Sequence, residues 1–343
     1  FQKNLPIVPI TDLTIKDGSL IVATQGRSIW MIDDLSVLHQ AEKADQNAEM
    51  VLYKPKDSYR TQGRASKEPS KTEGQNLPNG VISHYYLKDH SEKDSISMTY
   101  FSMKGDTLAS FSNTAKDKDK KMEVKKGGNT HVWDTQSKGA EKLDGMILWG
   151  ANLNGAKAVP GQYKVTLNVN GKETSQNFTT LPDPRAESTV ADMQKQYDFI
   201  KEVNTTIDKA HQSIKNMRKI NTQLDAFTKQ YKGNAQTKDL VEKANTMKEK
   251  FETVEKALYQ TQNRSRQDPL NFPIRLTNKL GALTGMMGYG DFPPTDQDIV
   301  VKDELTGKIN AQLATFDALI SKEIGEFNDE FNSLKLKYLA VEE

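Results

Sequence analysis

The spacing of apolar positions changes near residue 185. Before this point, apolar and polar residues alternate in short runs that are separated by Gly, Asn and Asp. After it, apolar residues recur in steps of three and four over long stretches that contain almost no Gly or Pro before Pro269. Alternation is typical of half-buried strands, whereas the longer period is typical of amphipathic helices. The sequence therefore predicts a β-rich first part and a helical second part.

The first strands are expected within residues 12–32. Leu13 and Ile15 alternate with polar neighbours, and Asp17-Gly18 supplies the two positive-φ residues of a tight hairpin turn. A third strand is expected at residues 28–32. Because three strands bury little apolar surface, this small sheet needs a partner sheet.

Residues 80–183 have the pattern of an immunoglobulin-like or fibronectin-III-like β-sandwich. Residues 81–87 and 95–101 are rich in β-forming side chains, and Asn170-Gly171 predicts another tight hairpin. The strand before this turn alternates strictly at Tyr163, Val165, Leu167 and Val169, and the returning strand carries Phe178. The lysine-rich segment Lys116–Lys126 falls between strands, where a solvated, mobile loop is favoured over an anion site.

Residues 41–79 are interpreted as a linker, because polar residues dominate them and the run from Thr61 to Gln75 is almost entirely polar. An alternative of equal weight is an excursion that packs on a neighbouring domain through Met50–Tyr53.

Residues 184–343 predict an antiparallel α-helical bundle. A long amphipathic helix begins near Ser188 or Thr189 and ends at Gly233, and a second helix should fold back against it after a short connection. Further helices are expected at residues 274–284 and 305–334, and Phe251 and Leu313 are expected to be buried. The heptad-like spacing also fits an intermolecular coiled coil, but the short connections favour a bundle within one chain.

Composition limits the function classes. The 343 residues are 36% hydrophobic and 27% charged, with a mean hydropathy of −0.70, which fits several modest cores better than one large globule. A formal net charge of +1 argues against dedicated nucleic-acid binding. The absence of cysteine excludes disulfides, thiolate zinc sites and cysteine nucleophiles. We expect no transmembrane segment, since no run approaches about 18 apolar residues.

The search for catalytic signatures yields no assignment. The sequence contains no nucleophile elbow, zinc-protease helix or calcium loop. Gly150 and Gly155 have the spacing of a phosphate loop, but Ala156 stands where its lysine belongs. A second glycine-rich pattern, Gly285–Gly290, is explained by a flexible loop or a helix terminus. The acidic pairs Asp33/Asp34 and Asp296/Asp298 are explained by turns and helix caps.

The five histidines, which are His39, His84, His90, His131 and His211, also suggest no strong site. Only His84 and His90 lie close in sequence, and a metal pair there is the weaker interpretation. His211 is expected at the boundary of the long helix's apolar face, not as a ligand. We therefore assign no catalytic, cofactor-binding or metal-binding residue and expect no cofactor.

Residues 11–35 resemble part of a known protein family. The string Ala-Thr-x-Gly-Arg-x-Ile-Trp at residues 23–30 resembles the closing blade of a sortilin-like (BNR/Asp-box) β-propeller, with Gly26, Arg27 and Trp30 as its structural blade motif. Residues 160–163, 183–185 and 268–274 are similar to strings in the C-terminal extensions of large bacterial exported proteins of this group, many of which are described as glycosyl hydrolases.

This resemblance implies that residues 1–40 are the remnant of a terminal blade, although a propeller needs several blades. The first hypothesis is then a non-catalytic scaffold or interaction region of a secreted, periplasmic or cell-envelope bacterial protein, whose partners are its upstream propeller and a protein or glycan. A second is part of a glycoside hydrolase whose catalytic propeller lies upstream, which leaves enzyme activity open. A third is a structural subunit of a cell-envelope assembly.

Overall fold

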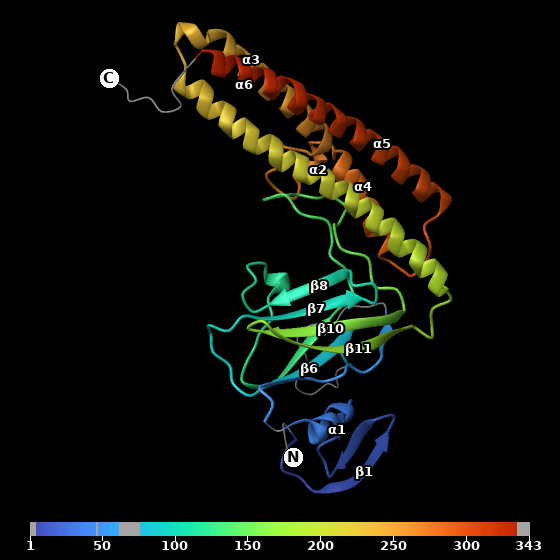
Figure 1. Cartoon of the computed structure of the whole chain (residues 1–343). Coiled ribbons are helices and arrows are strands. Elements are labelled where there is room, and N and C mark those ends of the chain that lie inside the picture. The colour runs from blue at the N-terminus through green and yellow to red at the C-terminus, as the bar shows by residue number, and fades with distance from the viewer. Residues whose placement is uncertain (1–4, 46, 62–75, 335–343) are drawn as a thin grey trace. The chain divides into compact units, whose positions relative to one another are not determined.

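The computed structural model describes residues 5–45, 47–61 and 76–334, and its chain divides into two compact units. The first unit comprises Phe1–Ser137 and Lys157–Val190, and the second comprises Lys138–Ala156 and Ala191–Glu343. Strands and sheets dominate the first unit and helices the second (Figure 1). The chain is therefore a multidomain protein that combines α and β structure.

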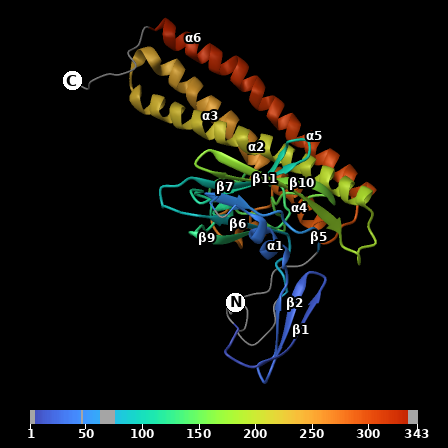
Figure 2. The ribbon, with the colours of Figure 1, turned by 60° about the horizontal axis from the view of Figure 1, so that its bottom comes forward.

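A small antiparallel sheet opens the first unit. Its strands β1 (Ile10–Lys16), β2 (Ser19–Thr24) and β3 (Ile29–Ile32) pair in sequence order, and a short helix, α1 (Ser36–Lys43), follows them. Asp17 and Gly18 have φ values of 52° and 77°, which a two-residue hairpin turn between twisted strands requires. The predicted hairpin and the third strand are thus confirmed; Figure 2 shows the β1–β2 hairpin from a second direction.

Two further sheets enclose one core in the first unit. The strands are β4 (Met50–Leu52), β5 (Ser58–Arg60), β6 (Val81–Leu87), β7 (Ile96–Ser102), β8 (Thr107–Ser112), β9 (Gly127–Trp133), β10 (Gly161–Val169) and β11 (Lys172–Pro182). They form a five-stranded sheet in the order β5-β11-β10-β7-β8 and a three-stranded sheet in the order β4-β6-β9. Trp133 of one sheet stacks on Tyr100 of the other, with ring centroids 4.6 Å apart. Both rings are fully buried, so the two sheets share a single aromatic core.

The second predicted hairpin is also confirmed. Asn170 and Gly171 have positive φ values of 53° and 87° between β10 and β11. Tyr163 and Phe178 are directly opposite each other across these strands, and their rings stack with centroids 5.9 Å apart. Cross-strand aromatic pairs of this kind stabilise a sheet beyond the area that they bury.

Residues 41–79 are more than a linker. β4 pairs with β6, and β5 runs parallel to β11 at the edge of the five-stranded sheet, so this range supplies a strand to each sheet. β4, at Met50–Leu52, falls within Met50–Tyr53, the residues through which the alternative interpretation expects this range to pack. Most of the polar run from Thr61 to Gln75 lies outside the described residues.

The lysines of Lys116–Lys126 are exposed, as expected for a solvated loop. The segment is nevertheless anchored, because it contains a short 3-10 turn, η1 (Lys118–Lys120), and the side chain of Met122 is buried in the core between the two larger sheets.

The second unit contains the helices that the 3.6-residue period predicts, but the last of them starts at Asp296 instead of residue 305 and is interrupted by a π-helical turn. They are α2 (Val190–Gln230), α3 (Lys238–Leu258), α4 (Leu276–Met287), α5 (Asp296–Leu319), the π-helical turn η4 (Ile320–Ile324) and α6 (Gly325–Ser333), with the short 3-10 turns η2 (Ala235–Thr237) and η3 (Asp268–Leu270). In Figures 1 and 2, α2, α3 and α5 run alongside one another. Buried residues of α2, α3, α4 and α5 form one core, as a bundle within one chain requires.

Two predicted core residues differ in their exposure. Phe251 on α3 is 1% exposed, as expected, and its ring lies edge-on to that of Phe316 at 5.8 Å. Leu313 on α5 is only partly buried against the same core. Leu313 is therefore less buried than expected. Only Leu305, Ile309 and Phe316 of α5 are buried, and the other residues of this helix are at least partly exposed.

The segment Lys138–Ala156 lies in the helical unit, although the sequence pattern had placed it inside the sandwich range 80–183. Its apolar side chains explain the difference, since Leu143 and Leu153 are buried in the bundle core. Polar contacts add to this packing. The Asn278 amide of α4 accepts a hydrogen bond from the Trp149 main-chain nitrogen (2.9 Å) and donates one to the Trp149 carbonyl oxygen (2.8 Å).

Candidate interaction surface

Gly26, Arg27 and Trp30, the residues on which the resemblance rests, lie in the turn between β2 and β3 and at the start of β3. The indole Nε1 of Trp30 donates a hydrogen bond to the carbonyl oxygen of Arg27 at 2.7 Å. Gly26 and Ser28 have φ values of 72° and 64°, a left-handed conformation that glycine adopts without strain. Local hydrogen bonding thus brings Trp30 and the Arg27 backbone together, and the Arg27 side chain is exposed.

Apolar side chains on the first face of the small sheet are exposed to solvent. The register places Leu13, Val22 and Trp30 on one line across the three strands, and Ile15, Leu20 and Ile32 on the next line of the same face. Leu13 and Ile15, on the edge strand β1, are 59% and 66% exposed.

The opposite face also exposes large apolar residues. Here Ile21 pairs with Met31, and Ala23 pairs with Ile29. Ile29 and Met31, on the other edge strand, are 72% and 55% exposed. A solvated sheet normally keeps one polar face, and exposed apolar patches usually mark a contact surface. We refer to Leu13, Ile15, Ile29 and Met31 as the sheet surface.

The histidines that are close in sequence have separate polar neighbours. His84 Nδ1 lies 3.0 Å from the Thr130 hydroxyl, and His90 Nδ1 lies 3.6 Å from Asp94 Oδ2. In the part of the chain that the structure describes, no three His, Asp or Glu side chains gather in a way that could hold a metal ion.

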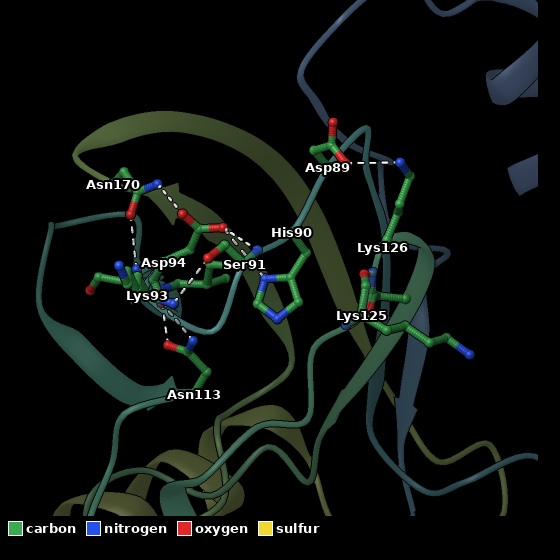
Figure 3. Close-up of polar contacts among 12 residues, drawn as sticks. Asp89, His90, Ser91, Lys93, Asp94, Asn113, Lys125, Lys126 and Asn170 are labelled. Carbon is green, nitrogen blue, oxygen red and sulfur yellow. Dashed lines mark hydrogen bonds and ion pairs between the residues drawn. The ribbon is translucent and has the colours of Figure 1, made fainter.

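The polar cluster around Asp94 fastens the turn between β6 and β7 (Figure 3). The Asp94 carboxylate accepts hydrogen bonds from the Asn170 amide (2.9 Å) and the Ser91 main-chain nitrogen (2.7 Å). These donors, with the Asn170 amide first, hold the pKa of Asp94 below its usual range. Asn113 donates to the Asp94 carbonyl oxygen at 2.8 Å, and Figure 3 shows these side chains converging on one turn. This geometry is that of a structural anchor.

The half-buried His131 and the fully buried His211 lie in different units. Burial lowers the pKa of His131 to about 4, and its ring lies against Phe111 with centroids 4.4 Å apart. His211 is completely buried, so its expected place at the boundary of the helix is wrong. Its Nδ1 donates to the Glu141 carbonyl oxygen, a partner 70 positions away in sequence.

One carboxylate of each acidic pair has the predicted turn or cap role. Asp298 and Thr295 form a reciprocal capping box at the start of α5. Asp34 accepts a hydrogen bond from the Ser36 main-chain nitrogen at 2.9 Å, just before α1.

Two hollows in the helical unit were not anticipated from the sequence. One, of about 720 Å³, lies between α2 and α6 and is lined by aromatic rings that include Phe227 and Phe327. The other, of about 520 Å³, is polar and contains the ion pair between Arg218 and the buried Glu255 at 2.8 Å. Their lining residues lie far apart in sequence, so only the folded chain reveals them.

Comparisons with known proteins provide no identification. No protein-family model and no curated protein matches this chain. Among solved structures, it is similar to pT26-6p at 9% sequence identity and a TM-score of 0.16, over 76% of this chain and 48% of that one. A likeness this weak carries no argument about fold or function. Each helix within the described residues is too short or too polar to cross a membrane.

Proposed function

We propose that this chain is a non-catalytic scaffold and interaction region of an exported, sortilin-like propeller protein. In this proposal β1–β3 is a terminal blade whose sheet surface packs against further β-sheet of the same protein. The two-sheet core serves as an immunoglobulin-like or fibronectin-III-like spacer, and the helical unit is an interaction module.

The exposed apolar residues on both faces of one small sheet carry this proposal. Leu13 and Ile15 on one face, and Ile29 and Met31 on the other, are each more than half exposed. Burying one such side chain stabilises a protein by about 1.5–3 kcal/mol, so a sheet inserted between two neighbours would gain on both faces. A blade of a propeller has neighbours on both faces by construction of the ring.

Hydrogen exchange tests the proposal directly. The present chain is compared with a longer chain that includes the sequence preceding Phe1 in its natural gene. We expect the main-chain amides of β1–β3 to exchange at least about tenfold more slowly in the longer chain, because covering both faces opposes local opening.

Paired substitutions supply the control. Ile29→Ser and Met31→Ser should lower the unfolding temperature of the longer chain while leaving that of the present chain nearly unchanged. Ile7→Ser is a matched control, because Ile7 is 95% exposed and lies outside the sheet. Equal exchange rates in both chains, with no effect of the two substitutions in the longer one, would falsify the proposal.

The longer chain also separates this proposal from the hydrolase alternative. Glycan turnover by the longer chain that disappears on a single substitution in its upstream part would favour a glycoside hydrolase. Turnover by the present chain alone would contradict a non-catalytic role.

A further inference from the structure

Exposed large hydrophobic side chains of the helical unit concentrate in one stretch. Of the eight such residues in its described part, two are Trp149 and Leu270, and the other six lie between residues 286 and 301. These six define the α4–α5 patch, which consists of Met286, Tyr289, Phe292, Ile299, Val300 and Val301. Tyr289 is 91% exposed and Phe292 is 66% exposed. Singly scattered apolar residues are normal on a protein surface, so it is their concentration in this one stretch of the sequence that calls for an explanation.

A buried glutamine holds the loop that presents the two aromatic rings. Gln196 of α2 is 4% exposed, and its Nε2 lies within hydrogen-bond distance of three carbonyl oxygens. These belong to Met287 (3.0 Å), Gly290 (2.8 Å) and Phe292 (3.1 Å). The loop therefore curls around one side chain and is ordered before any partner arrives, which lowers the entropic cost of binding.

The ring of Phe292 rests on the loop itself. A Cβ atom on Gly290 would lie 2.8 Å from Phe292 Cδ2 and 2.9 Å from Cε2, closer than real Cβ atoms approach. Glycine at this position thus lets the ring lie against the loop backbone with its outer side in solvent. An ordered aromatic side chain of this kind is a common anchor in protein interfaces.

Acidic side chains surround the apolar residues at the start of α5. Val300 is 63% exposed, and helical spacing places Asp296 four residues before it and Asp303 and Glu304 three and four residues after it. Of the five acidic residues between 291 and 304, Asp291 is buried and Asp298 caps the helix, which leaves Asp296, Asp303 and Glu304 as the exposed acidic rim. Lys302 pairs with Glu202 and Asp303, and Lys308 pairs with Glu304, so the rim carboxylates together with Glu202 outnumber these lysines four to two.

We propose that the α4–α5 patch binds a segment of a partner protein in which apolar residues are flanked by lysine or arginine. The apolar side chains of the segment would cover Tyr289, Phe292 and Val300, and its cations would face the acidic rim. A second copy of this chain fits poorly, because a symmetric contact would place acidic rim against acidic rim. The patch belongs to the helical unit and is independent of the sheet surface.

Fluorescence anisotropy with two synthetic peptides tests this proposal on the full chain. One labelled peptide contains only leucine and lysine in an amphipathic helical pattern, and the other has glutamate in place of lysine. We expect the lysine peptide to bind and the glutamate peptide not to bind. Val300→Ser and Tyr289→Ser should each weaken binding about tenfold, since exposed anchors of an interface typically contribute this much.

Matched variants distinguish binding at the α4–α5 patch from non-specific hydrophobic binding elsewhere on the chain. Leu270→Ser removes a hydrophobic residue of similar exposure (69%) outside the patch and should leave affinity unchanged. Asp303→Asn should weaken binding, and the loss should shrink as salt is added. Circular dichroism verifies that each variant is folded.

Three results would overturn the proposal: equal binding of both peptides, unchanged affinity in Val300→Ser and Tyr289→Ser, or an equal loss in Leu270→Ser. Sedimentation that detects a dimer of this chain which Val300→Ser dissociates would also overturn it, because the occupant would then be a second copy.

Discussion

His211 Nδ1 lies 2.6 Å from the carbonyl oxygen of Glu141, and this contact joins the middle of α2 to the segment Lys138–Ala156. Glu141 has two further bonds to the same helix: its main-chain nitrogen donates to Asp208 Oδ1 at 2.5 Å, and its carboxylate pairs with Lys215 Nζ at 2.6 Å. One residue is thus held by three side chains on one face of α2, which fixes where the segment enters the bundle.

The buried position of His211 predicts that the helical unit loses stability in mild acid. Burial lowers the pKa of His211, although the Glu141 carbonyl and the nearby Asp208 and Glu141 charges act in the opposite direction. The unfolded chain, with a histidine pKa of about 6.5, therefore binds this proton more readily than the folded chain. Stability from this group is present above that value and is lost as the pH falls below it.

Urea unfolding followed by helical circular dichroism between pH 7.5 and 5 measures this effect. His211→Asn keeps a donor for the Glu141 carbonyl but cannot become charged, so its stability should fall less steeply with pH than that of the wild type. His39→Asn, at an exposed histidine, is the matched control and should follow the wild type. Parallel pH profiles for all three proteins would contradict the prediction.

The Asp94 anchor predicts an acid sensitivity of the first unit. The Asn170 amide and the Ser91 main-chain nitrogen hold the pKa of Asp94 below its usual value, so its stabilising effect is present above about pH 4 and is lost as the pH falls further. Asp94→Asn turns one acceptor oxygen into an amide that faces donors. We expect a lower unfolding temperature at pH 7 and a smaller difference from the wild type at pH 3.

Calorimetry at the two pH values provides the measurement for Asp94. Asp57→Asn, at an exposed carboxylate of the same unit, should leave the unfolding temperature nearly unchanged at both pH 7 and pH 3. A deficit of Asp94→Asn that stays the same at both pH values would mean that the ionised carboxylate is not the source of stability.

The difference in burial between Phe251 and Leu313 predicts unequal losses on truncation to alanine. Phe251→Ala empties a site that is 1% exposed and packs on Phe316, so it should cost about 3–5 kcal/mol. Leu313→Ala removes a partly buried side chain and should cost about 1 kcal/mol. Urea unfolding of the two variants decides the matter, and equal losses would show that α5 is covered more completely than this structure has it.

The sequence predicted those features that depend on neighbouring residues. Asp17-Gly18 and Asn170-Gly171 each specify a hairpin through the positive φ values that these residue types tolerate, and the 3.6-residue period places the long helices. The location of Lys138–Ala156 depends instead on contacts with distant residues. Nothing near Glu141 in the sequence indicates that His211 will meet it, so the burial of His211 was missed as well.

The sheet surface was predictable only in part. Alternation at Leu13 and Ile15 indicates which side of a strand is apolar, but not which part of the molecule covers that side. Register adds the missing information, because it places Ile29 and Met31 on the opposite face from Leu13 and Ile15. The α4–α5 patch was missed since its apolar residues are divided among the end of α4, a loop and the first two turns of α5, where periodicity has little meaning.

Two helical glycines offer a paired test of close packing. A Cβ atom at Gly281 of α4 would lie 3.3 Å from both the Asn152 carbonyl oxygen and Leu153 Cδ2, whereas one at Gly307 of α5 would meet nothing within 4 Å. Gly307→Ala should stabilise the protein by about 0.5–1 kcal/mol through helix propensity. Gly281→Ala should gain less than this, and Gly281→Val should destabilise, because the larger side chain pushes against the segment that contains Leu153.

Thermal unfolding of these three variants measures the packing of Lys138–Ala156 on α4. An equal gain in stability from Gly281→Ala and Gly307→Ala would argue against close contact between α4 and this segment. An increase in stability from Gly281→Val would exclude such contact.

Gln196 provides the last prediction, because one side-chain nitrogen serves three carbonyl oxygens of the α4–α5 loop. Gln196→Glu preserves the shape of the side chain but replaces the donor with an acceptor, which leaves partly buried carbonyls unpaired and should cost about 1–3 kcal/mol. Gln194→Glu, an exposed position on the same helix, should cost much less. Faster hydrogen exchange at residues 287–292 in the Gln196 variant alone would identify the loop as the source of the loss. Equal stability and equal exchange in both variants would mean that the loop keeps its shape without Gln196, and that the order of the Tyr289 and Phe292 rings has another origin.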